Sequence, residues 1–218
     1  MKFAKWILVL VIAFISTAPA FADTNVALGA SVSTSGPGFG IPDPAGEWGS
    51  GNYQPNSIAN GTPQADGTQW NLGTAFWIQV VDGSVQGGAD PNDVLTVTLT
   101  GEDTIDSLVL QADNNDDYSV SYLNGSTWTP MYTFGEVGGW GLTTRPTFDL
   151  GTPITTHAFE ITTTGGDGYY AVGQFEAFGT PASAATPEPN TSILLLSGLL
   201  ALAFVAMRKR FAGLFGQL

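Results

Sequence analysis

Two apolar runs, one near each end of the chain, bracket a middle segment that is almost free of positive charge. All 19 acidic residues lie between Asp23 and Glu188, and the only cation in that range is Arg145, which gives a formal charge of −18. The remaining Lys and Arg residues flank the two apolar runs. The ends and the middle therefore differ in chemistry, and each predicts a different structure.

The N-terminal run predicts a secretory signal peptide over residues 1–22. Lys2 and Lys5 precede a short apolar stretch, which is about half of the ~20 residues that span a bilayer as a helix. Ala20 and Ala22 then form the A-x-A pattern that signal peptidase cuts. We expect export and cleavage after Ala22, and a retained membrane anchor is the alternative.

The C-terminal run predicts a transmembrane helix over residues 191–210. Its first 17 residues, Thr191 to Met207, carry no charge, and a basic cluster follows them. That length is at the short end for a membrane span, so a buried core helix is the alternative. Positive charge after the helix places that side in the cytoplasm and the acidic domain outside. The basic cluster is Arg208, Lys209 and Arg210, and a short tail, 211–218, follows it.

A Pro-rich spacer over residues 180–190 precedes this helix and contains the tripeptide Pro187, Glu188, Pro189. The order of Pro-Glu-Pro, apolar helix and basic cluster resembles the PEP-CTERM sorting signal of Gram-negative bacteria. The resemblance implies recognition by exosortase, a membrane-embedded protease, which would cut near the tripeptide. An ordinary C-terminal anchor is the alternative, because further residues follow the basic cluster.

Residues 23–179 predict one all-β domain. The chain holds 28 Gly and 13 Pro, a composition that favours turns and short strands over long helices. Apolar and polar residues alternate over 95–100 and 118–122, as in half-buried antiparallel strands. Turn signals separate the runs, notably Asn124-Gly125 and the glycine-rich segment 165–168. We therefore expect a β-sandwich or jelly roll. Further expected strands are 25–30, 76–81, 105–112, 147–150, 157–162 and 174–178.

Seven segments in order resemble a discoidin domain, the galactose-binding-like jelly roll also called the coagulation factor 5/8 type C domain. They include Asn25-Val26-Ala27-Leu28-Gly29-Ala30, Thr68-Gln69-Trp70 and Phe76-Trp77-Ile78-Gln79-Val80. The resemblance implies a discoidin-like jelly-roll β-sandwich with a non-catalytic role in carbohydrate binding. The other segments are 56–61, 105–110, 118–128 and 174–179.

The same resemblance implies a structural Ca²⁺ site at Asn60 and Gln174. Both are neutral amides, whereas Ca²⁺ prefers charged oxygen ligands, so the site is weakened. Residues 113–117 start like an EF-hand loop, but they lack its glycine and its closing glutamate. We interpret them as a solvated hairpin turn.

Aromatic residues in Gly-rich loops are the candidates for ligand binding. Trp48 and Tyr53 lie in the Gly- and Pro-rich loop segment 36–55, and Trp140 lies in the loop 138–141, where flat rings can pack on sugars. Packing at the end of the sandwich is the alternative. The tryptophans that we assign to the core are Trp70, Trp77 and Trp128.

The composition excludes several classes of function. The chain has no Cys and a single His, so disulfides, thiolate metal sites and multi-His sites are ruled out. A net charge of −13 disfavours nucleic acid as a partner. No nucleophile motif surrounds His157, and no acidic pair stands out as a glycosidase pair. Arg145 has a structural role or hydrogen-bonds a ligand.

The sequence therefore predicts an exported bacterial surface or extracellular-matrix protein that is not an enzyme. Its expected partners are exosortase, the secretion machinery, the cytoplasmic membrane and extracellular polysaccharide in an exopolysaccharide matrix or biofilm. We expect it first in the cytoplasmic membrane facing the periplasm, and then at the cell surface or in the matrix. A purely structural adhesin and a secreted glycan-active enzyme are the alternatives.

Overall fold

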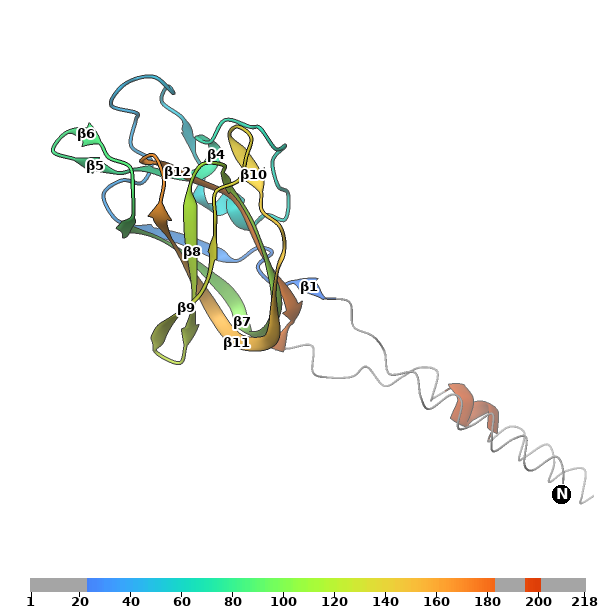
Figure 1. Ribbon diagram of the computed structural model, residues 1–218. Coiled ribbons are helices and arrows are strands. Elements are labelled where there is room, and N and C mark those ends of the chain that lie inside the picture. Colours follow the sequence, from blue (N-terminus) through green and yellow to red (C-terminus); the bar gives the residue numbers. More distant parts are fainter. Residues whose placement is uncertain (1–22, 183–194, 201–218) are drawn as a thin grey trace, which may run out of the picture. The chain divides into compact units, whose positions relative to one another are not determined.

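The computed structural model describes residues 23–182 and 195–200 (Figure 1). The predicted signal peptide and most of the Pro-rich spacer lie outside these ranges, as do the residues Ala20, Ala22, Pro187, Glu188, Pro189, Arg208, Lys209 and Arg210. Of the predicted transmembrane helix, only 195–200 are described, and they are helical and exposed. Within the two described ranges, no helix is long and apolar enough to cross a membrane.

Residues 23–182 form a largely antiparallel β-sandwich, which confirms the all-β prediction. Its one helical element within these residues is the 3-10 helix η1 (Pro55–Ala59). The strands are β1 (Thr24–Asn25), β2 (Ser31–Ser35), β3 (Asn52–Tyr53), β4 (Leu72–Ile78), β5 (Val80–Val81), β6 (Ser84–Val85), β7 (Asp90–Asp113), β8 (Asp117–Asn124), β9 (Thr127–Phe134), β10 (Leu142–Thr144), β11 (Phe148–Gly165) and β12 (Tyr169–Thr180).

Two long strands, β7 and β11, take part in both layers of the sandwich. The first part of β7 pairs with β2 and with the second part of β11, which continues to β8 and β9. The second part of β7 pairs with β12, β10 and the first part of β11, and β12 continues to β4. Figure 1 shows both strands bending at the bottom of the domain. The sequence predicted two short strands in place of each long one, 95–100 and 105–112 for β7, and 147–150 and 157–162 for β11. In the structure each pair is one continuous strand.

The main core lies between the two layers. Leu95, Val97 and Leu99 of β7 are buried, as their alternation with threonines predicts. Trp77 of β4 is fully buried in the same core, again as predicted. Trp128 is only half-buried on β9, so its assignment to the core is wrong. β9 is an edge strand, so no further strand lies beside it to cover that side chain fully.

A second, smaller apolar cluster covers the other face of β4. Because side chains alternate along a strand, Ala75 and Trp77 enter the main core while Phe76 and Ile78 point to the opposite side. Segment 36–55, predicted as a loop, supplies half-buried side chains that pack against this second cluster. Strand β4 is therefore buried on both faces, which explains its almost continuous apolar run.

The expected strand at residues 25–30 is mostly wrong. Only Thr24–Asn25 form a strand, and residues 26–29 form a turn. Gly29 has a φ of +76°, a left-handed conformation that interrupts an extended run, and Leu28 is 58% exposed. The glycine is thus a turn signal inside a segment that resembles a strand.

Replacing Leu95 with Ala tests the main core. Leu95 is fully buried, so we expect Leu95→Ala to lower the free energy of unfolding by about 2–5 kcal/mol. Thr98→Ala, an exposed position on the same strand, is the matched control and should change it by less than about 0.5 kcal/mol. Urea denaturation measures both, and equal effects would contradict the assigned faces of β7.

Candidate functional site

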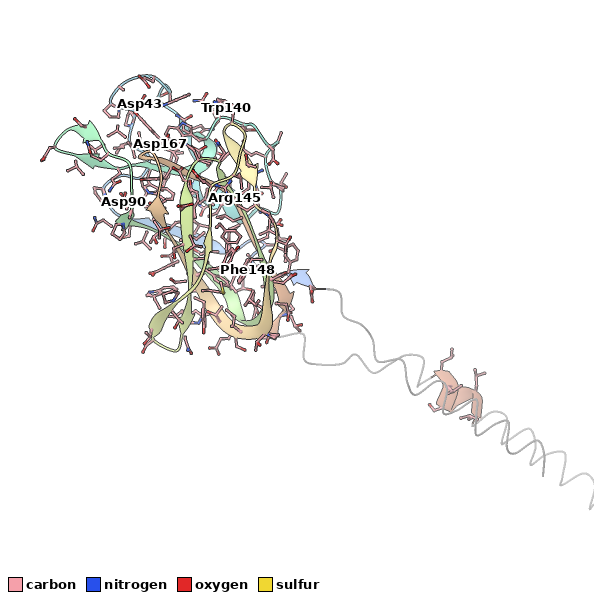
Figure 2. All side chains as sticks on the ribbon, viewed as in Figure 1. Asp43, Asp90, Trp140, Arg145, Phe148 and Asp167 are labelled. Atoms are coloured by element: carbon pink, nitrogen blue, oxygen red, sulfur yellow. The ribbon has the colours of Figure 1, made fainter. Side chains whose placement is uncertain are left out.

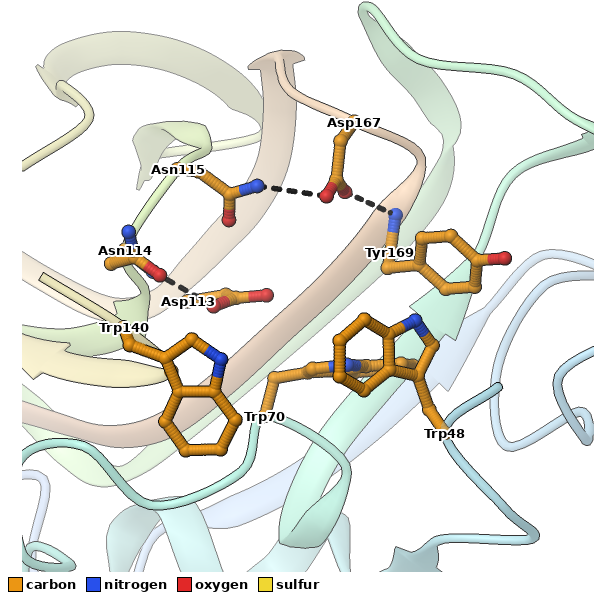
Figure 3. A pocket seen from close by; sticks show the side chains of 9 residues that line it. Trp48, Trp70, Asp113, Asn114, Asn115, Trp140, Asp167 and Tyr169 are labelled. Carbon is orange, nitrogen blue, oxygen red and sulfur yellow. Dashed lines mark hydrogen bonds between the residues drawn. The ribbon is translucent and has the colours of Figure 1, made fainter. Parts of the chain in front are cut away.

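A cavity of about 140 Å³ lies at one end of the sandwich (Figure 3). It brings together two of the predicted aromatic residues, Trp48 and Trp140, from loops far apart in the sequence. Figure 2 shows Asp43, Trp140 and Asp167 at this same end of the domain. The cavity is lined by Trp48, Trp70, Asp113, Asn114, Asn115, Trp140, Gly141, Asp167 and Tyr169.

Aromatic side chains form one side of the cavity. Trp70 is 4% exposed, and its ring centroid lies 5.5 Å from those of Phe76 and Tyr169. Trp70 therefore both belongs to the second apolar cluster and lines the cavity. Trp48 is half-buried against that cluster, whereas Trp140 is 55% exposed. The aromatic side chains of the cavity thus range from buried Trp70, through half-buried Trp48, to mostly exposed Trp140.

The loop that carries Trp48 is held by the carboxylate of Asp43. Asp43 accepts hydrogen bonds from the backbone N–H groups of Ala45 and Trp48, each at 3.0 Å, and from the hydroxyl of Tyr169 at 3.1 Å. Desolvation acts to raise the pKa of Asp43, but these hydrogen bonds outweigh it and the pKa is lowered. A charged Asp43 thereby fixes Trp48 next to Tyr169.

The loop that carries Trp140 is held by backbone contacts. The Leu142 N–H donates to the Thr68 carbonyl, and the Asn114 N–H donates to the Gly141 carbonyl. Gly141 has a φ of +65°, and a Cβ at this position would collide with the Thr68 carbonyl oxygen. Only glycine fits there, so the sequence Trp140-Gly141 places an exposed tryptophan on a tightly anchored turn.

Polar side chains form the other side of the cavity. The Asn115 amide donates to Asp167 Oδ2 at 2.7 Å, and the Tyr169 N–H donates to Asp167 Oδ1 at 2.9 Å. Asp113 Oδ1 accepts the Asn114 N–H at 2.9 Å. Figure 3 shows these Asp and Asn side chains facing the three tryptophans across the cavity. One side of the cavity can pack against apolar ring faces and the other can hydrogen-bond hydroxyl groups, the two kinds of surface that a sugar presents.

Arg145 lies beneath the polar side and is 2% exposed. Its guanidinium donates to four backbone carbonyls, those of Ala112, Asp113, Thr143 and Asp116. These bonds tie the turn between β7 and β8 to the strand that follows Trp140. The structural role expected for Arg145 is therefore the one observed, although its partners are carbonyl groups and not a carboxylate.

The turn at residues 113–117 differs from the sequence interpretation. It connects β7 and β8, but β11 lies between these two strands in the sheet, so the turn does not close a hairpin, and Asp113 and Asp116 are buried and not solvated. Burial raises the pKa of Asp113 to about 7, with a further contribution from the charge of Asp167. Burial, together with the charges of Asp113 and Asp167, raises the pKa of Asp116 to about 8. The sequence alone could not reveal this, because an acidic turn is normally exposed.

The other candidate ligand-binding residue, Tyr53, does not line the cavity. Its ring packs edge-on to Phe76 with centroids 5.6 Å apart, and its hydroxyl hydrogen-bonds Thr34 Oγ1 at 2.8 Å. Sequence reasoning missed Asp113, Asp167 and Tyr169 as cavity residues. The glycine-rich turn at 165–168 was the one sequence signal near Asp167 and Tyr169, and it marked a turn without indicating a cavity.

The calcium candidates Asn60 and Gln174 were also placed by the structure. Asn60 is exposed, and its Oδ1 accepts the Thr62 N–H at 2.7 Å. Gln174 is buried, and its amide has no hydrogen-bond partner among the described residues. Within 23–182 and 195–200, no group of three or more His, Cys, Asp or Glu side chains could hold a metal ion. Two amides without a carboxylate do not match the charged oxygen ligands that Ca²⁺ prefers. A metal ion at Asn60 and Gln174 is therefore an untested prediction that the residues present do not favour.

The buried acids predict an unusual pH dependence. Above pH 5, the folded domain keeps a proton on Asp113 up to about pH 7 and on Asp116 up to about pH 8, whereas the unfolded chain, with a reference pKa of 3.8, has lost both. Stability should therefore fall as pH rises through this window, by up to about 1.4 kcal/mol per pH unit for each group. Thermal unfolding at pH 5, 6.5 and 8 measures it. Asp113→Asn should flatten the slope, and an unchanged slope would contradict the assignment.

Residues 185–210 match the family model of the PEP-CTERM protein-sorting motif, which confirms that prediction. The motif implies export and membrane-associated sorting, with processing by exosortase. A comparison with curated protein sequences found no match.

Several solved structures are similar to the domain. Chitosan-binding module 1 of a chitosanase/glucanase from Paenibacillus sp. IK-5 is 20% identical, with a TM-score of 0.44 over 72% of this chain and 99% of that chain. The family 32 module of C. perfringens NanJ, solved with galactose, is 16% identical, with a TM-score of 0.46 over 72% and 98%. The family 32 module of Streptococcus pneumoniae EndoD is 14% identical, with a TM-score of 0.45 over 72% and 100%. The chain thus carries a PEP-CTERM motif after an all-β domain, and these similar structures are carbohydrate-binding modules.

Proposed function

We propose that the chain is an exported surface or matrix protein whose β-domain binds polysaccharide without cleaving it. The observation that carries this proposal is the cavity in which Trp48, Trp70 and Trp140 face side chains that can hydrogen-bond hydroxyl groups. Tryptophan faces pack against the C–H faces of sugar rings, and nearby carboxylates and amides bind the hydroxyls. The cavity offers both surfaces within one site.

The exposure of Trp140 supports a binding role over packing. A tryptophan that plugs the end of a sandwich would be buried, yet Trp140 is 55% exposed. Its backbone is nevertheless fixed by the anchored turn at Gly141. A rigid loop that presents a large aromatic side chain to solvent reduces the entropy lost on binding.

The ends of the chain support a location outside the cell. We propose that the signal peptide is cut after Ala22, that 191–210 span the cytoplasmic membrane, and that exosortase cuts near Pro187-Glu188-Pro189. The domain would then face the periplasm before it reaches the cell surface or the exopolysaccharide matrix of a biofilm. An acidic body with no lysine and a single arginine fits an exported domain that does not adhere to nucleic acid.

Two alternatives stay distinct from this proposal. A purely structural adhesin would have the same fold and bind no glycan. A secreted glycan-active enzyme would release products from its polysaccharide. Incubating the protein with the glycan that it binds and analysing the supernatant by mass spectrometry separates binding from cleavage.

Removing the aromatic surface tests the site. Trp140→Ala and Trp48→Ala in the full chain should each weaken glycan binding at least 10-fold on an array, since each removes a ring that packs on sugar. Trp128→Ala, half-buried on β9 outside the cavity, is the matched control and should bind as the unchanged protein does. Trp140→Ala should leave the melting temperature nearly unchanged because the ring is mostly exposed. Unaltered binding in both cavity variants would reject this site.

Processing of the termini tests the sorting proposal. We expect the mature protein from the native host to begin at Asp23 and to end near Pro187, and intact-mass spectrometry measures both ends. Replacing Pro187 and Pro189 with Ala should leave the protein membrane-bound with its tail intact. A mature form that extends to Leu218 in the unchanged protein would favour a simple anchor.

A further inference from the structure

Two buried acidic side chains lie close together at the start of β7. Asp90 and Asp93 are each 2% exposed, and both line a second pocket of about 120 Å³. Among the described residues, none lines both this pocket and the tryptophan-lined cavity. Figure 2 shows Asp90 on the left side of the domain, away from Trp140. The two acids therefore form a site of their own.

One carboxylate oxygen of Asp90 is buried without a hydrogen-bond partner. Asp90 Oδ1 accepts the Asn92 N–H at 3.3 Å, whereas Oδ2 has no partner among the described residues. A polar atom that is removed from water and left unpaired costs free energy of folding, so it needs a proton or a ligand as its partner.

The carboxyl group of Asp93 lies beside that of Asp90. Burial raises the pKa of Asp93 to about 7, and the neighbouring Asp90 carboxylate adds to the rise, although the Gly38 N–H donates to Asp93 Oδ1 at 2.9 Å and opposes it. Arg145, the only cation between Asp23 and Glu188, donates instead to backbone carbonyls around the turn between β7 and β8. The protein itself thus supplies no positive charge to this pair of acids.

A backbone carbonyl oxygen approaches the same pair. The position that a Cβ on Gly38 would occupy lies 2.6 Å from Asp93 Oδ2 and 2.7 Å from the Ile78 carbonyl oxygen. A side chain there would separate the two oxygens, and glycine leaves them facing the same small space. Gln79 and Asn92 line the pocket as well, so its polar groups are rich in oxygen.

We propose that Asp90 and Asp93 bind a Ca²⁺ ion in this pocket, with the Ile78 carbonyl oxygen and water completing its coordination. Ca²⁺ combines carboxylates, carbonyls and water in irregular geometry, whereas Mg²⁺ demands a nearly ideal octahedron. The ion would pair with the buried Asp90 oxygen and displace the proton that Asp93 otherwise keeps. This site differs from Asn60 and Gln174, because it offers two charged ligands. The proposal does not depend on glycan binding.

The bound ion would stabilise the loop segment 36–55. Gly38 belongs to that segment and donates to Asp93, so an ion on Asp93 holds the start of the segment against β7. The same segment carries Trp48 at the cavity. Because only two carboxylates take part, we expect an affinity in the range of extracellular calcium modules, with a Kd of about 10⁻⁴ to 10⁻³ M.

The melting temperature of the full chain in mild detergent tests the proposal. After treatment with EDTA at neutral pH, about 5 mM CaCl₂ should raise it by about 3 °C or more, because a ligand that binds only the folded state stabilises that state. NaCl at equal ionic strength is the control for screening of the acidic domain and should shift it by less than about 1 °C. MgCl₂ should act less than CaCl₂.

Asp90→Asn distinguishes a calcium site from two acids that only share a proton. The new amide can donate to Asp93, so without calcium the variant should melt at or above the temperature of the unchanged protein. Its response to CaCl₂ should nevertheless be lost. Asp93→Asn keeps an oxygen for the Gly38 N–H, should lose the response as well, and serves if Asp90→Asn does not fold. Glu102→Gln, at an exposed site outside the pocket, is the matched control and should respond fully.

Three outcomes would overturn the proposal. The absence of a calcium-specific shift in the unchanged protein would mean that the two acids only share a proton. A shift that persists in Asp90→Asn and Asp93→Asn would place the ion elsewhere, and loss of the shift in Asn60→Ala alone would place it at Asn60. An equal shift with MgCl₂ would contradict the choice of Ca²⁺.

Discussion

The pairing of β7 with β11 is the interaction on which the rest of the domain depends. Each strand contributes its first part to one layer and its second part to the other, so the two layers share a continuous backbone at the bend. Strands β2, β8 and β9 extend one layer from this pair, and β4 and β12 extend the other. The main core fills the space between them, with Leu95 and Phe159 fully buried on the two long strands.

The cavity depends on a second packing layer outside this sandwich. The outer face of β4 and β12 is apolar at Phe76 and Ala171, and the long Gly- and Pro-rich segment covers it. Asp43 fixes that segment through Tyr169, while Arg145 fixes the opposing turn through backbone carbonyls. Trp48, Trp70 and Tyr169 belong to this outer cluster and also line the cavity, so the packing of the cluster sets the shape of the cavity.

Local patterns predicted much of the fold and part of the site. The alternation over residues 95–100 and the Asn124-Gly125 turn gave strands and a hairpin that the structure confirms, because register and turn conformation are local properties. The loop tryptophans Trp48 and Trp140 do meet in one cavity. Burial of Asp113 and the approach of Tyr169 could not be predicted, since both depend on which distant strands become neighbours. For the same reason the sequence could not show that Tyr53 packs away from the cavity.

The first and last strands of the domain are hydrogen-bonded neighbours, with Thr24 opposite Gly179 and Asn25 opposite Phe178. Just past this pair, the Ala182 N–H donates to Asp103 Oδ1 at 2.8 Å and fastens the chain to β7. Figure 2 shows Trp140 near the top of the domain, and Figure 1, in the same view, shows β1 on its right side, below the middle. Proteolysis before Thr24 or beyond Ala182 would therefore remove no strand from the sandwich and would leave the tryptophan-lined cavity whole.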